Sequence, residues 1–202
     1  EEGNSDADNY RDATLNAAHG QGVSMTADSD IPSVIGKGQL FDGAGDYITV
    51  SQEPVFDLTT AMHISAWIRV DNFDLGYQTI ASKGGDAWRV SRTNTTDALH
   101  VALGLESEDD FFDIYGRAGV NDSSWHQAVF TWDARELCIW VDGAQDTCAA
   151  SHASIPAIPA NDHEVCIGSN PLANRFWEGG IDELRISSEV RSPGWIKLNY
   201  EN

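Results

Sequence analysis

The chain has 202 residues, of which 41% are hydrophobic and 22% are charged, a balance that excludes a wholly disordered protein. It contains 12 Lys and Arg residues and 32 Asp and Glu residues, which gives a net charge of -20. Because such a surface repels phosphate, the charge excludes nucleic acid and anionic membranes as favourable partners. The sequence has no run of about 18 apolar residues, so no membrane insertion is predicted. The carboxylates have two interpretations: a surface that keeps the protein soluble, or ligands for a hard divalent cation.

The first 36 residues are rich in Asn, Asp, Gly and Ser and show little periodicity, which predicts a polar, partly irregular lead-in. From residue 37 onward, short segments of alternating apolar and polar residues recur about every 10 residues, each bounded by turn-forming residues. We therefore expect one domain over residues 1–202, with the lead-in at 1–36 and the core at 37–200.

The alternating segments are predicted to be β-strands, because side chains two residues apart share one face of a strand. They are Gln39–Asp42, Asp46–Val50, His63–Val70, Gln78–Lys83, Ala87–Ser91, Ala98–Leu105, Phe111–Tyr115, His126–Trp132, Leu137–Val141, Val165–Ile167 and Ile181–Ser187. Helical periodicity is absent until the end of the chain. The pattern predicts an all-β protein, two antiparallel sheets packed as a β-sandwich or jelly roll.

Three cysteines, Cys138, Cys148 and Cys166, allow one disulfide and one free thiol. Cys138 and Cys148 flank the hairpin signal Asp142-Gly143. A three-residue loop there would place the two cysteines opposite each other. With a two-residue turn in a regular hairpin, the two cysteines would be offset by one residue and would not form a cross-strand pair. We predict a Cys138–Cys148 disulfide, which indicates an oxidising compartment: extracellular, cell-surface or periplasmic.

The last element is predicted to be a short C-terminal helix. Ser192 is a favourable N-cap and Pro193 suits the first helical position. Trp195 and Leu198 are expected to pack down on the sandwich as a lid.

Four segments, in order, resemble bacterial laminin-G-like jelly-roll domains of the concanavalin-A-like lectin/glucanase superfamily. Residues 40–48 (LFDGAGDYI) resemble the opening "F-D-G-x-x-D-Y-I" of such domains, and residues 64–69 (ISAWIR) resemble their "I-S-A-W-I" strand. Residues 125–132 (WHQAVFTW) with 139–143 (IWVDG) resemble the central strand pair, and residues 180–186 (GIDELRI) the closing strand. The resemblance implies a concanavalin-A-like sandwich; the superfamily contains lectins, laminin modules, pentraxins and some glycosidases, so the fold alone does not give the function.

A structural calcium near the chain ends is common in such jelly rolls, and two aspartates agree with this expectation. By strand alternation, Asp46 shares a face with Ile48 and Val50, and Asp182 shares a face with Leu184 and Ile186. A carboxylate that heads an apolar row needs compensation, which a cation can provide. We predict Ca2+ ligands in the order Asp182, Asp42 and Asp46, with the carbonyl of Gly43 and a contribution from Asp12 or Asn16. The alternative is that these acids cap turns through backbone N–H groups.

Catalysis is not predicted. Glu108 and Asp113 belong to an E-x-D-x-x-D segment that resembles the E-x-D-x-x-E strand of jelly-roll glucanases, which use the two outer acids as nucleophile and general acid. The final Asp in place of Glu departs from that pattern, so a glycoside hydrolase is the least favoured hypothesis.

A ligand is expected to bind aromatic side chains at strand ends and in loops, beside polar neighbours that can hydrogen-bond to a sugar. The predicted ligand-binding residues are Trp177 and Arg175, ranked first, and Trp88, Tyr77, Tyr115 and His100; the alternative is that the aromatics are ordinary half-buried residues. We predict a non-catalytic, secreted binding or adhesion module with a structural calcium that recognises carbohydrate. A protein-interaction or spacer domain of a larger surface adhesin is the second hypothesis; the partner is a glycan or a surface protein, and the sequence gives no oligomeric state.

Overall fold

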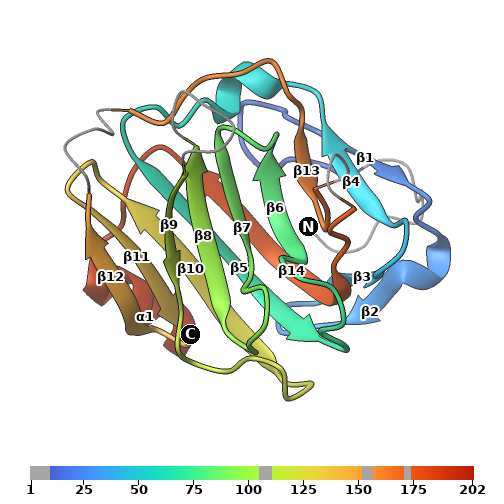
Figure 1. Ribbon diagram of the computed structural model, residues 1–202. Helices are drawn as coiled ribbons and strands as arrows, with labels where there is room; N and C mark the ends of the chain where they lie inside the picture. The colour runs from blue at the N-terminus through green and yellow to red at the C-terminus, as the bar shows by residue number, and fades with distance from the viewer. Residues whose placement is uncertain (1–9, 105–110, 152–156, 171–173) are drawn as a thin grey trace.

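The computed structural model describes residues 10–104, 111–151, 157–170 and 174–202. They form two antiparallel seven-stranded sheets that stack face to face, so the predicted all-β sandwich is confirmed (Figure 1). Sheet A, nearer the viewer in Figure 1, contains β1 (Gly20–Val23), β4 (Tyr47–Val50), β13 (Val165–Ile167), β6 (Thr79–Lys83), β7 (Trp88–Arg92), β8 (Leu99–Gly104) and β9 (Phe111–Tyr115), in spatial order. Sheet B contains β12 (Ala144–Ala150), β11 (Glu136–Val141), β10 (Trp125–Trp132), β5 (Met62–Val70), β14 (Glu178–Ser187), β3 (Lys37–Asp42) and β2 (Asp30–Pro32).

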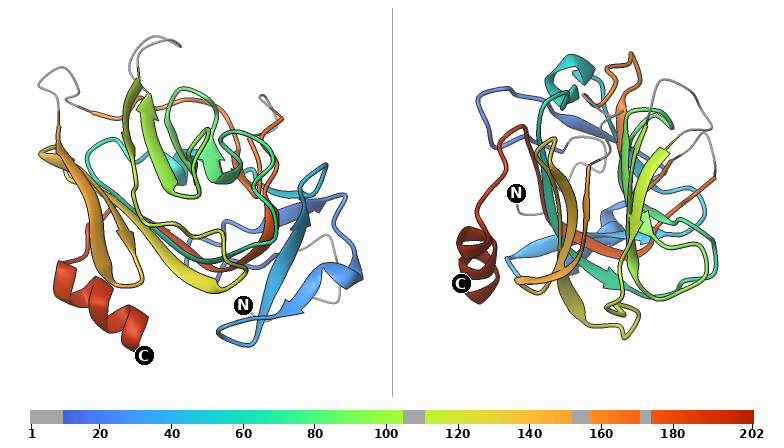
Figure 2. Two further views of the ribbon diagram at one scale, coloured as in Figure 1. Left: turned by 60° about the horizontal axis from the view of Figure 1, so that its bottom comes forward. Right: turned by 60° about the vertical axis from the view of Figure 1, so that its left-hand side comes forward.

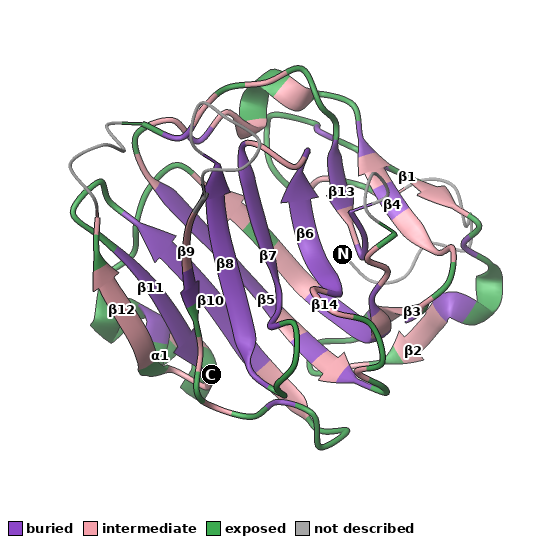
Figure 3. Ribbon diagram, viewed as in Figure 1, coloured by how far each residue is buried: buried purple, intermediate pink, exposed green. Residues whose placement is uncertain are grey.

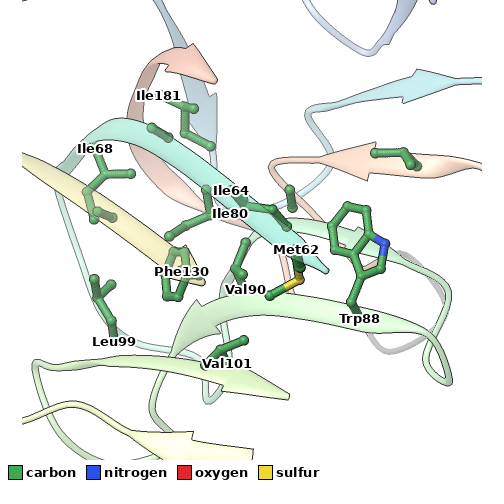
Figure 4. Packing of buried hydrophobic residues seen from close by; sticks show 14 of the residues in the cluster. Met62, Ile64, Ile68, Ile80, Trp88, Val90, Leu99, Val101, Phe130 and Ile181 are labelled. Carbon is green, nitrogen blue, oxygen red and sulfur yellow. The ribbon is translucent and has the colours of Figure 1, made fainter. Parts of the chain in front are cut away.

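The core lies between the sheets and is built by strand alternation. On β5, Ile64, Ala66 and Ile68 point inward, and on β7 and β8 the inward residues include Trp88, Val90, Leu99 and Val101. Figure 4 labels six of these side chains, which interleave with Met62, Ile80, Phe130 and Ile181 from neighbouring strands. Every labelled side chain in that view is fully or almost fully buried, so apolar burial is the main term that holds the two sheets together.

Three strands were not predicted. β1 and β2, with the short 3-10 helix η1 (Ala27–Ser29) between them, lie in the part of the chain that was expected to be irregular. β12 is the second arm of the cysteine hairpin. These strands carry few large apolar residues, so the sequence shows no clear alternation there. They are held by pairing with neighbouring strands: β1 with β4, β2 with β3 and β12 with β11.

The hairpin that carries Cys138 and Cys148 has a two-residue turn, the turn length for which the two cysteines were not expected to lie opposite each other. Asp142 and Gly143 both have positive φ, 51° and 72°, as a type I′ turn requires. A β-bulge between Ile139 and Trp140 then shifts the register by one residue, so that Cys138 lies opposite Cys148, with Cα atoms 4.2 Å apart, and the two form a disulfide. The carboxylate of Asp146 in the bulge accepts hydrogen bonds from the backbone N–H groups of Arg117 and Ala118.

Helix α1 (Pro193–Glu201) begins as predicted, with the Ser192 hydroxyl accepting a hydrogen bond from the Trp195 N–H. It lies on the outside of sheet B (Figure 2). The expected lid is only partly correct: Ile196 is the buried contact, and Trp195 meets the ring of His63 edge-on, whereas Leu198 is 58% exposed. Burial lowers the pKa of His63 to about 4, so this ring is neutral under the helix at pH 7. In the described part of the chain, no helix is long and apolar enough to cross a bilayer.

Candidate functional site

The outer face of sheet A carries the candidate site. The strands β6, β7 and β8 are buried at every residue, on the outer face as well as the inner face, as their uniform colour in Figure 3 shows. The buried outward residues are mostly polar and include Ser82, Arg89, Ser91 and His100. Larger side chains from neighbouring segments therefore cover a polar floor, which differs from an ordinary solvated sheet face.

Strand register brings the outward residues into two rows. Ser91, His100 and Tyr115 lie opposite one another on β7, β8 and β9. The next row contains Arg89, Ala102 and Asp113. The inward residues between them, such as Val90, Val101 and Ile114, belong to the core, so alternation fixes the direction of every side chain in the two rows.

A chain of hydrogen bonds holds these rows rigid. Burial lowers the pKa of His100, so the ring is neutral and has one donor and one acceptor nitrogen. Because the Asp113 carboxylate can only accept, His100 Nε2 donates to Asp113 Oδ2 at 3.1 Å, and Nδ1 accepts from the Ser91 hydroxyl at 3.1 Å. The hydrogen bond from His100 lowers the pKa of Asp113, which therefore stays ionised. Tyr115 also donates to Asp113 Oδ2, at 2.8 Å.

Two loop residues complete the arrangement. Tyr77 precedes β6 and places its hydroxyl 3.4 Å from that of Tyr115, and its ring centroid lies 5.0 Å from that of His100. The guanidinium carbons of Arg89 and Arg175 lie 5.6 Å and 5.0 Å from the centroid of the Tyr77 ring. We call these six residues the tyrosine–arginine cluster: Tyr77, Arg89, His100, Asp113, Tyr115 and Arg175.

The backbone holds both loop residues in place. The Tyr77 N–H donates to the Thr93 carbonyl, and the Arg175 carbonyl accepts from the Thr79 N–H at the start of β6. Tyr77 has a φ of 58°, a left-handed conformation that is costly for a residue with a large side chain. Such strain persists only where the surroundings impose it, and it is common at binding sites. Tyr115 remains 47% exposed, so the cluster presents an aromatic face to solvent.

The structure brings together four of the six predicted ligand-binding residues: Tyr77, His100, Tyr115 and Arg175. The prediction is corrected for the two tryptophans. Trp88 is 1% exposed and Trp177 is 0% exposed, and both point into the core between the sheets. Their side chains cannot reach a ligand on the outer face. Ser91 was missed, although its place in an alternating strand, one residue after the core residue Val90, was a usable signal.

The predicted metal ligands do not converge on one point. Asp182 lies opposite Trp67, and Glu178, four residues earlier on β14, lies opposite Asp42. At about 3.3 Å per residue, Asp182 and the Asp42 turn are separated by roughly 13 Å along the strand. A single calcium ion, with ligands at about 2.3–2.6 Å, cannot bridge that distance.

The argument that placed Asp182 at the head of an apolar row is also corrected. A β-bulge follows Asp182, where Glu183 has a φ of 49°. Across the bulge, Ile186 lies opposite the inward residue Ile64, whereas Asp182 lies opposite Trp67, which stacks on Tyr200 at the outer face of sheet B. The extra residue breaks the alternation on which the prediction rested.

Three of the predicted ligands cap turns, the alternative interpretation. Asp182 accepts hydrogen bonds from the Ser33 hydroxyl and from the N–H groups of Ile35 and Glu183. Asp42 Oδ1 accepts from the N–H groups of residues 44, 45 and 46. Asp12 accepts from the N–H groups of residues 14 and 18 and from the hydroxyl of residue 14.

The Asp42 turn is nevertheless crowded with carboxylates. Partial burial and the charge of Asp42 raise the pKa of Asp46. Partial burial, followed by the charges of Asp74, Asp71 and Asp42, raises the pKa of Glu178. We call this group the acidic edge: Asp42, Asp46, Asp71, Asp74 and Glu178. In both cases repulsion between carboxylates adds to the larger effect of burial, and a bound cation would relieve that repulsion.

A cavity of about 920 Å³ lies at another place, where β1, β4 and β13 face β3 and β14. It is lined by inward apolar residues that include Phe41, Ile48 and Ile181, together with Asp12 and Asp182. Its apolar lining continues into the core, and of its three acids Asp12 and Asp182 are engaged as turn caps and Glu183 pairs with Arg185.

The glucanase-like segment does not supply a pair of acids in the described structure. Glu108 lies outside the described residues. Asp113, the other outer acid of the motif, is bonded to His100 and Tyr115 in the floor of the cluster. Its role is to orient those two side chains.

Comparison with known proteins gives the same fold. The binding domain of Paraclostridial Mosquitocidal Protein 1 superimposes with a TM-score of 0.75 at 14% identity, covering 94% of this chain and 48% of that chain. The binding domain of botulinum neurotoxin DC, in complex with rat synaptotagmin II, gives 0.60 at 13% identity, covering 96% and 45%. Domain 4 of AbnA, a GH43 extracellular arabinanase from Geobacillus stearothermophilus, in complex with arabinotriose, gives 0.62 at 16% identity, covering 84% and 79%.

This chain thus spans about half the length of the two toxin binding domains and most of the arabinanase domain. No curated protein matches the sequence. The family Laminin_G_3, described as the concanavalin A-like lectin/glucanases superfamily, matches residues 42–197, which is most of the chain. On that match, joined to the two-sheet jelly-roll topology, the chain belongs to the concanavalin A-like lectin/glucanase superfamily.

Proposed function

We propose that the protein is a non-catalytic binding module that recognises carbohydrate through the tyrosine–arginine cluster. The observation that carries the proposal is the exposed ring of Tyr115, fixed by its hydrogen bond to Asp113 beside Tyr77 and Arg175. Sugar rings stack on flat aromatic faces, and arginine and tyrosine supply donors for their hydroxyl groups. Because the side chains are already held in place, little conformational entropy is lost when a ligand binds.

The fold neighbours support a binding role. Two are binding domains of toxins, and one is an ancillary domain of an arabinanase in complex with arabinotriose. In the cluster, Asp113 is occupied by two donors and His100 is neutral and hydrogen-bonded at both nitrogens. These groups position other side chains, and such an arrangement favours recognition over proton transfer.

The proposal predicts that Tyr115→Ala strongly weakens glycan binding while leaving the fold intact. Removing a central aromatic anchor typically costs about 2 kcal/mol or more, roughly a 30-fold loss of affinity. Binding is measured on a glycan array and then by titration calorimetry with the best saccharide. Tyr200→Ala is the matched control, because it removes a tyrosine that is 38% exposed from helix α1, on the outside of the opposite sheet. Equal affinities for Tyr115→Ala and wild type would contradict the proposal.

A protein receptor is the second candidate function, favoured by the complex of the botulinum neurotoxin DC binding domain with synaptotagmin II. In this function the same rigid sandwich would bind a protein, and no sugar ring would stack on the aromatic side chains. It predicts that the array finds no saccharide for the wild-type protein. The adhesin or spacer role belongs to this second candidate.

We also propose an extracellular or cell-surface location. The Cys138–Cys148 disulfide supports it, because such bonds persist in oxidising compartments. One fold neighbour is a domain of an extracellular enzyme.

A calcium ion at the acidic edge is a further part of the proposal. Asp42 Oδ2, Asp46, Glu178 and the carbonyl of Gly43 are oxygen donors of the type that calcium prefers. Gly43 itself is required, because it has a φ of 74° and a Cβ there would lie 2.9 Å from the Glu178 Cβ. The ion would neutralise the crowded carboxylates and fix the turn between β3 and β4.

We expect millimolar calcium to raise the melting midpoint relative to a chelator. At free calcium a hundredfold above its dissociation constant the stabilisation is about 2.7 kcal/mol, roughly 5–10 °C for a domain of this size. Glu178→Gln should lose most of this shift, whereas Asp182→Asn should keep it, because that carboxylate lies about 13 Å away. A calcium-independent midpoint in the wild-type protein would exclude the ion and leave the glycan proposal unaffected.

A further inference from the structure

His126 lies between two carboxylates at the start of β10, outside both the tyrosine–arginine cluster and the acidic edge. Its Nδ1 lies 2.8 Å from Asp142 Oδ2, and its Nε2 lies 3.1 Å from Asp122 Oδ1. Asp142 belongs to the two-residue turn between β11 and β12, whereas Asp122 belongs to the loop between β9 and β10. One imidazole ring therefore joins two connections that are not consecutive in the chain.

Both contacts are hydrogen bonds only if both ring nitrogens carry a proton. An ionised carboxylate offers acceptors and no donor, so each ring nitrogen must donate. A hydrogen bond from the backbone N–H of Ser124, and then one from the His126 ring, lowers the pKa of Asp122, which is therefore ionised at pH 7. A neutral imidazole has a single N–H, and its other nitrogen would place a lone pair against a carboxylate oxygen. The geometry thus identifies the ring as an imidazolium.

The two acids also favour the protonated ring electrostatically. Burial by itself lowers the pKa of His126. The hydrogen bonds to Asp142 and Asp122, followed by their two negative charges, outweigh burial and raise the pKa above 6.5.

The other charged side chains on the elements packed beside the ring have partners of their own. On β5, which pairs with β10, Arg69 lies 3.1 Å from Asp71. On α1, Lys197 and Tyr200 lie against the β11–β12 turn, and the Lys197 ammonium lies 3.7 Å from Glu201. The site therefore holds one imidazolium against two carboxylates.

Both connections that meet at the ring contain a residue in the left-handed region. Asp142 has a φ of 51°, and Ser123 has a φ of 63°. Such conformations are costly for residues other than glycine and persist only where the surroundings impose them. Asp122 Oδ1 also accepts from the Ser124 N–H at 2.8 Å, so the atom that bonds to His126 spans the strained residue. Loss of the ring contact would therefore loosen this loop.

We propose that His126 is a pH-sensitive clamp, which ties the β9–β10 loop to the β11–β12 turn as an imidazolium and releases Asp122 when it loses its proton. The neutral ring keeps one N–H, and Asp142 retains it, because its contact is the shorter one and its side chain is 30% exposed, against 59% for Asp122. This inference goes beyond the proposed glycan-binding function and does not depend on it.

The sign of the pH dependence follows from the raised pKa. A group that binds its proton more tightly in the folded protein than in the unfolded chain stabilises the fold in its protonated form. The stabilisation is complete below about pH 6.5, the pKa of histidine in an unfolded chain, and it is lost as the pH rises through the higher pKa of folded His126.

The first experiment is an NMR titration of the wild-type protein from pH 5.5 to 9. We expect both His126 ring nitrogens to be protonated at the acidic end and the ring to titrate above about pH 6.5. The Ser124 amide resonance should move with the same midpoint, because its acceptor is the carboxylate that the ring releases. A His126 pKa at or below 6.5, or a Ser124 amide that does not follow the ring, would overturn the clamp.

Thermal unfolding measures the effect on stability. Relative to His126→Gln, the wild-type melting midpoint should fall as the pH rises from 6 to 9, by roughly 3–5 °C for each pH unit that separates the folded and unfolded pKa values. Parallel pH profiles for the two proteins would contradict the proposal.

Asp122→Asn tests the second acceptor with a milder change, because asparagine keeps an oxygen for the Ser124 N–H and removes the charge. It should lower the pKa of His126. Asp133→Asn is the matched control: Asp133 is also an exposed acid that accepts from the N–H two residues on and precedes a left-handed residue, Ala134, with a φ of 65°. No ion pair of the described residues joins it to a histidine. Equal changes of the His126 pKa in the two variants would show a general charge effect and would overturn the inference.

Discussion

Lys83→Met is expected to lower the stability of the domain by about 3 kcal/mol, because removing one partner of a buried ion pair leaves the other charges uncompensated. The Lys83 side chain is 0% exposed at the end of β6. Its ammonium lies 2.8 Å from Glu53 and 2.9 Å from Asp57, the acids at the start and just after the end of the 3-10 helix η2 (Glu53–Phe56). It also donates to the backbone carbonyl and side-chain oxygen of Asn161. One ammonium thus joins two loops to sheet A.

Methionine keeps an unbranched side chain that is only one heavy atom shorter, so most of the loss would come from the electrostatics and little from a cavity. For a domain of this size, about 3 kcal/mol corresponds to a fall in the melting midpoint of roughly 6–12 °C, measured by thermal unfolding followed by circular dichroism. Lys37→Met is the matched control: Lys37 pairs with Asp30 at 3.2 Å but is 54% exposed, so its loss should cost less than about 0.5 kcal/mol.

A triple variant tests the cause. If the two acids left without a counterion are the source of the instability, then adding Glu53→Gln and Asp57→Asn to Lys83→Met should recover much of it. Equal midpoints for Lys83→Met and Lys37→Met would show that the buried ammonium contributes no more than a surface pair.

Local alternation in the sequence was sufficient to predict most strands of the sandwich, but it did not determine the register. The bulge at Asp146 restores the pairing of Cys138 with Cys148 after a two-residue turn. The bulge after Asp182 has the opposite effect and separates that acid from the face of Ile186. A bulge adds one residue without a composition of its own, so the residues on either side of it cannot be assigned to a face from the chain alone.

The candidate site was partly predictable for the same reason. Trp88 was predicted to bind the ligand, and Arg89 follows it in the same strand, where adjacent residues point to opposite faces. The structure places Trp88 in the core and Arg89 in the cluster. In contrast, the contact between Tyr77 and Arg175 joins residues almost a hundred positions apart. Tyr77 lies just before β6 and Arg175 lies between β13 and β14, and the two residues meet because β6 and β13 are neighbours in sheet A.

The position of an aromatic residue in a loop of the sequence did not predict its exposure. Trp177, ranked first as a sugar platform, ends a loop just before the glycines of β14 and looked exposed in sequence. In the fold its backbone N–H donates to Gly168 and its carbonyl accepts from Gly43, so both sides of its peptide unit are tied to neighbouring segments. The ring is then directed inward, where it meets Phe73 edge-on at 5.7 Å. Tyr115, on a regular strand, carries the exposed ring instead.

Trp177→Ala is therefore expected to act on stability and not on ligand contact. The side chain is 0% exposed, and truncating a fully buried tryptophan to alanine costs about 3–5 kcal/mol, because the apolar transfer energy is lost and a cavity remains. The fall in the melting midpoint should be roughly 6–20 °C. Trp177→Phe, which retains the edge-on contact with Phe73, should recover a substantial part of this loss.

The comparison with Tyr115→Ala separates a core residue from a binding residue. Below its lowered midpoint, folded Trp177→Ala protein should bind the selected glycan with nearly wild-type affinity, whereas Tyr115→Ala should unfold at nearly the wild-type temperature and lose binding. These opposite outcomes follow from the position of the two rings on opposite faces of sheet A, one against the core and one in solvent. A Trp177→Ala protein that melted normally but failed to bind would place the ligand site at β14 and refute the assignment to the outer face.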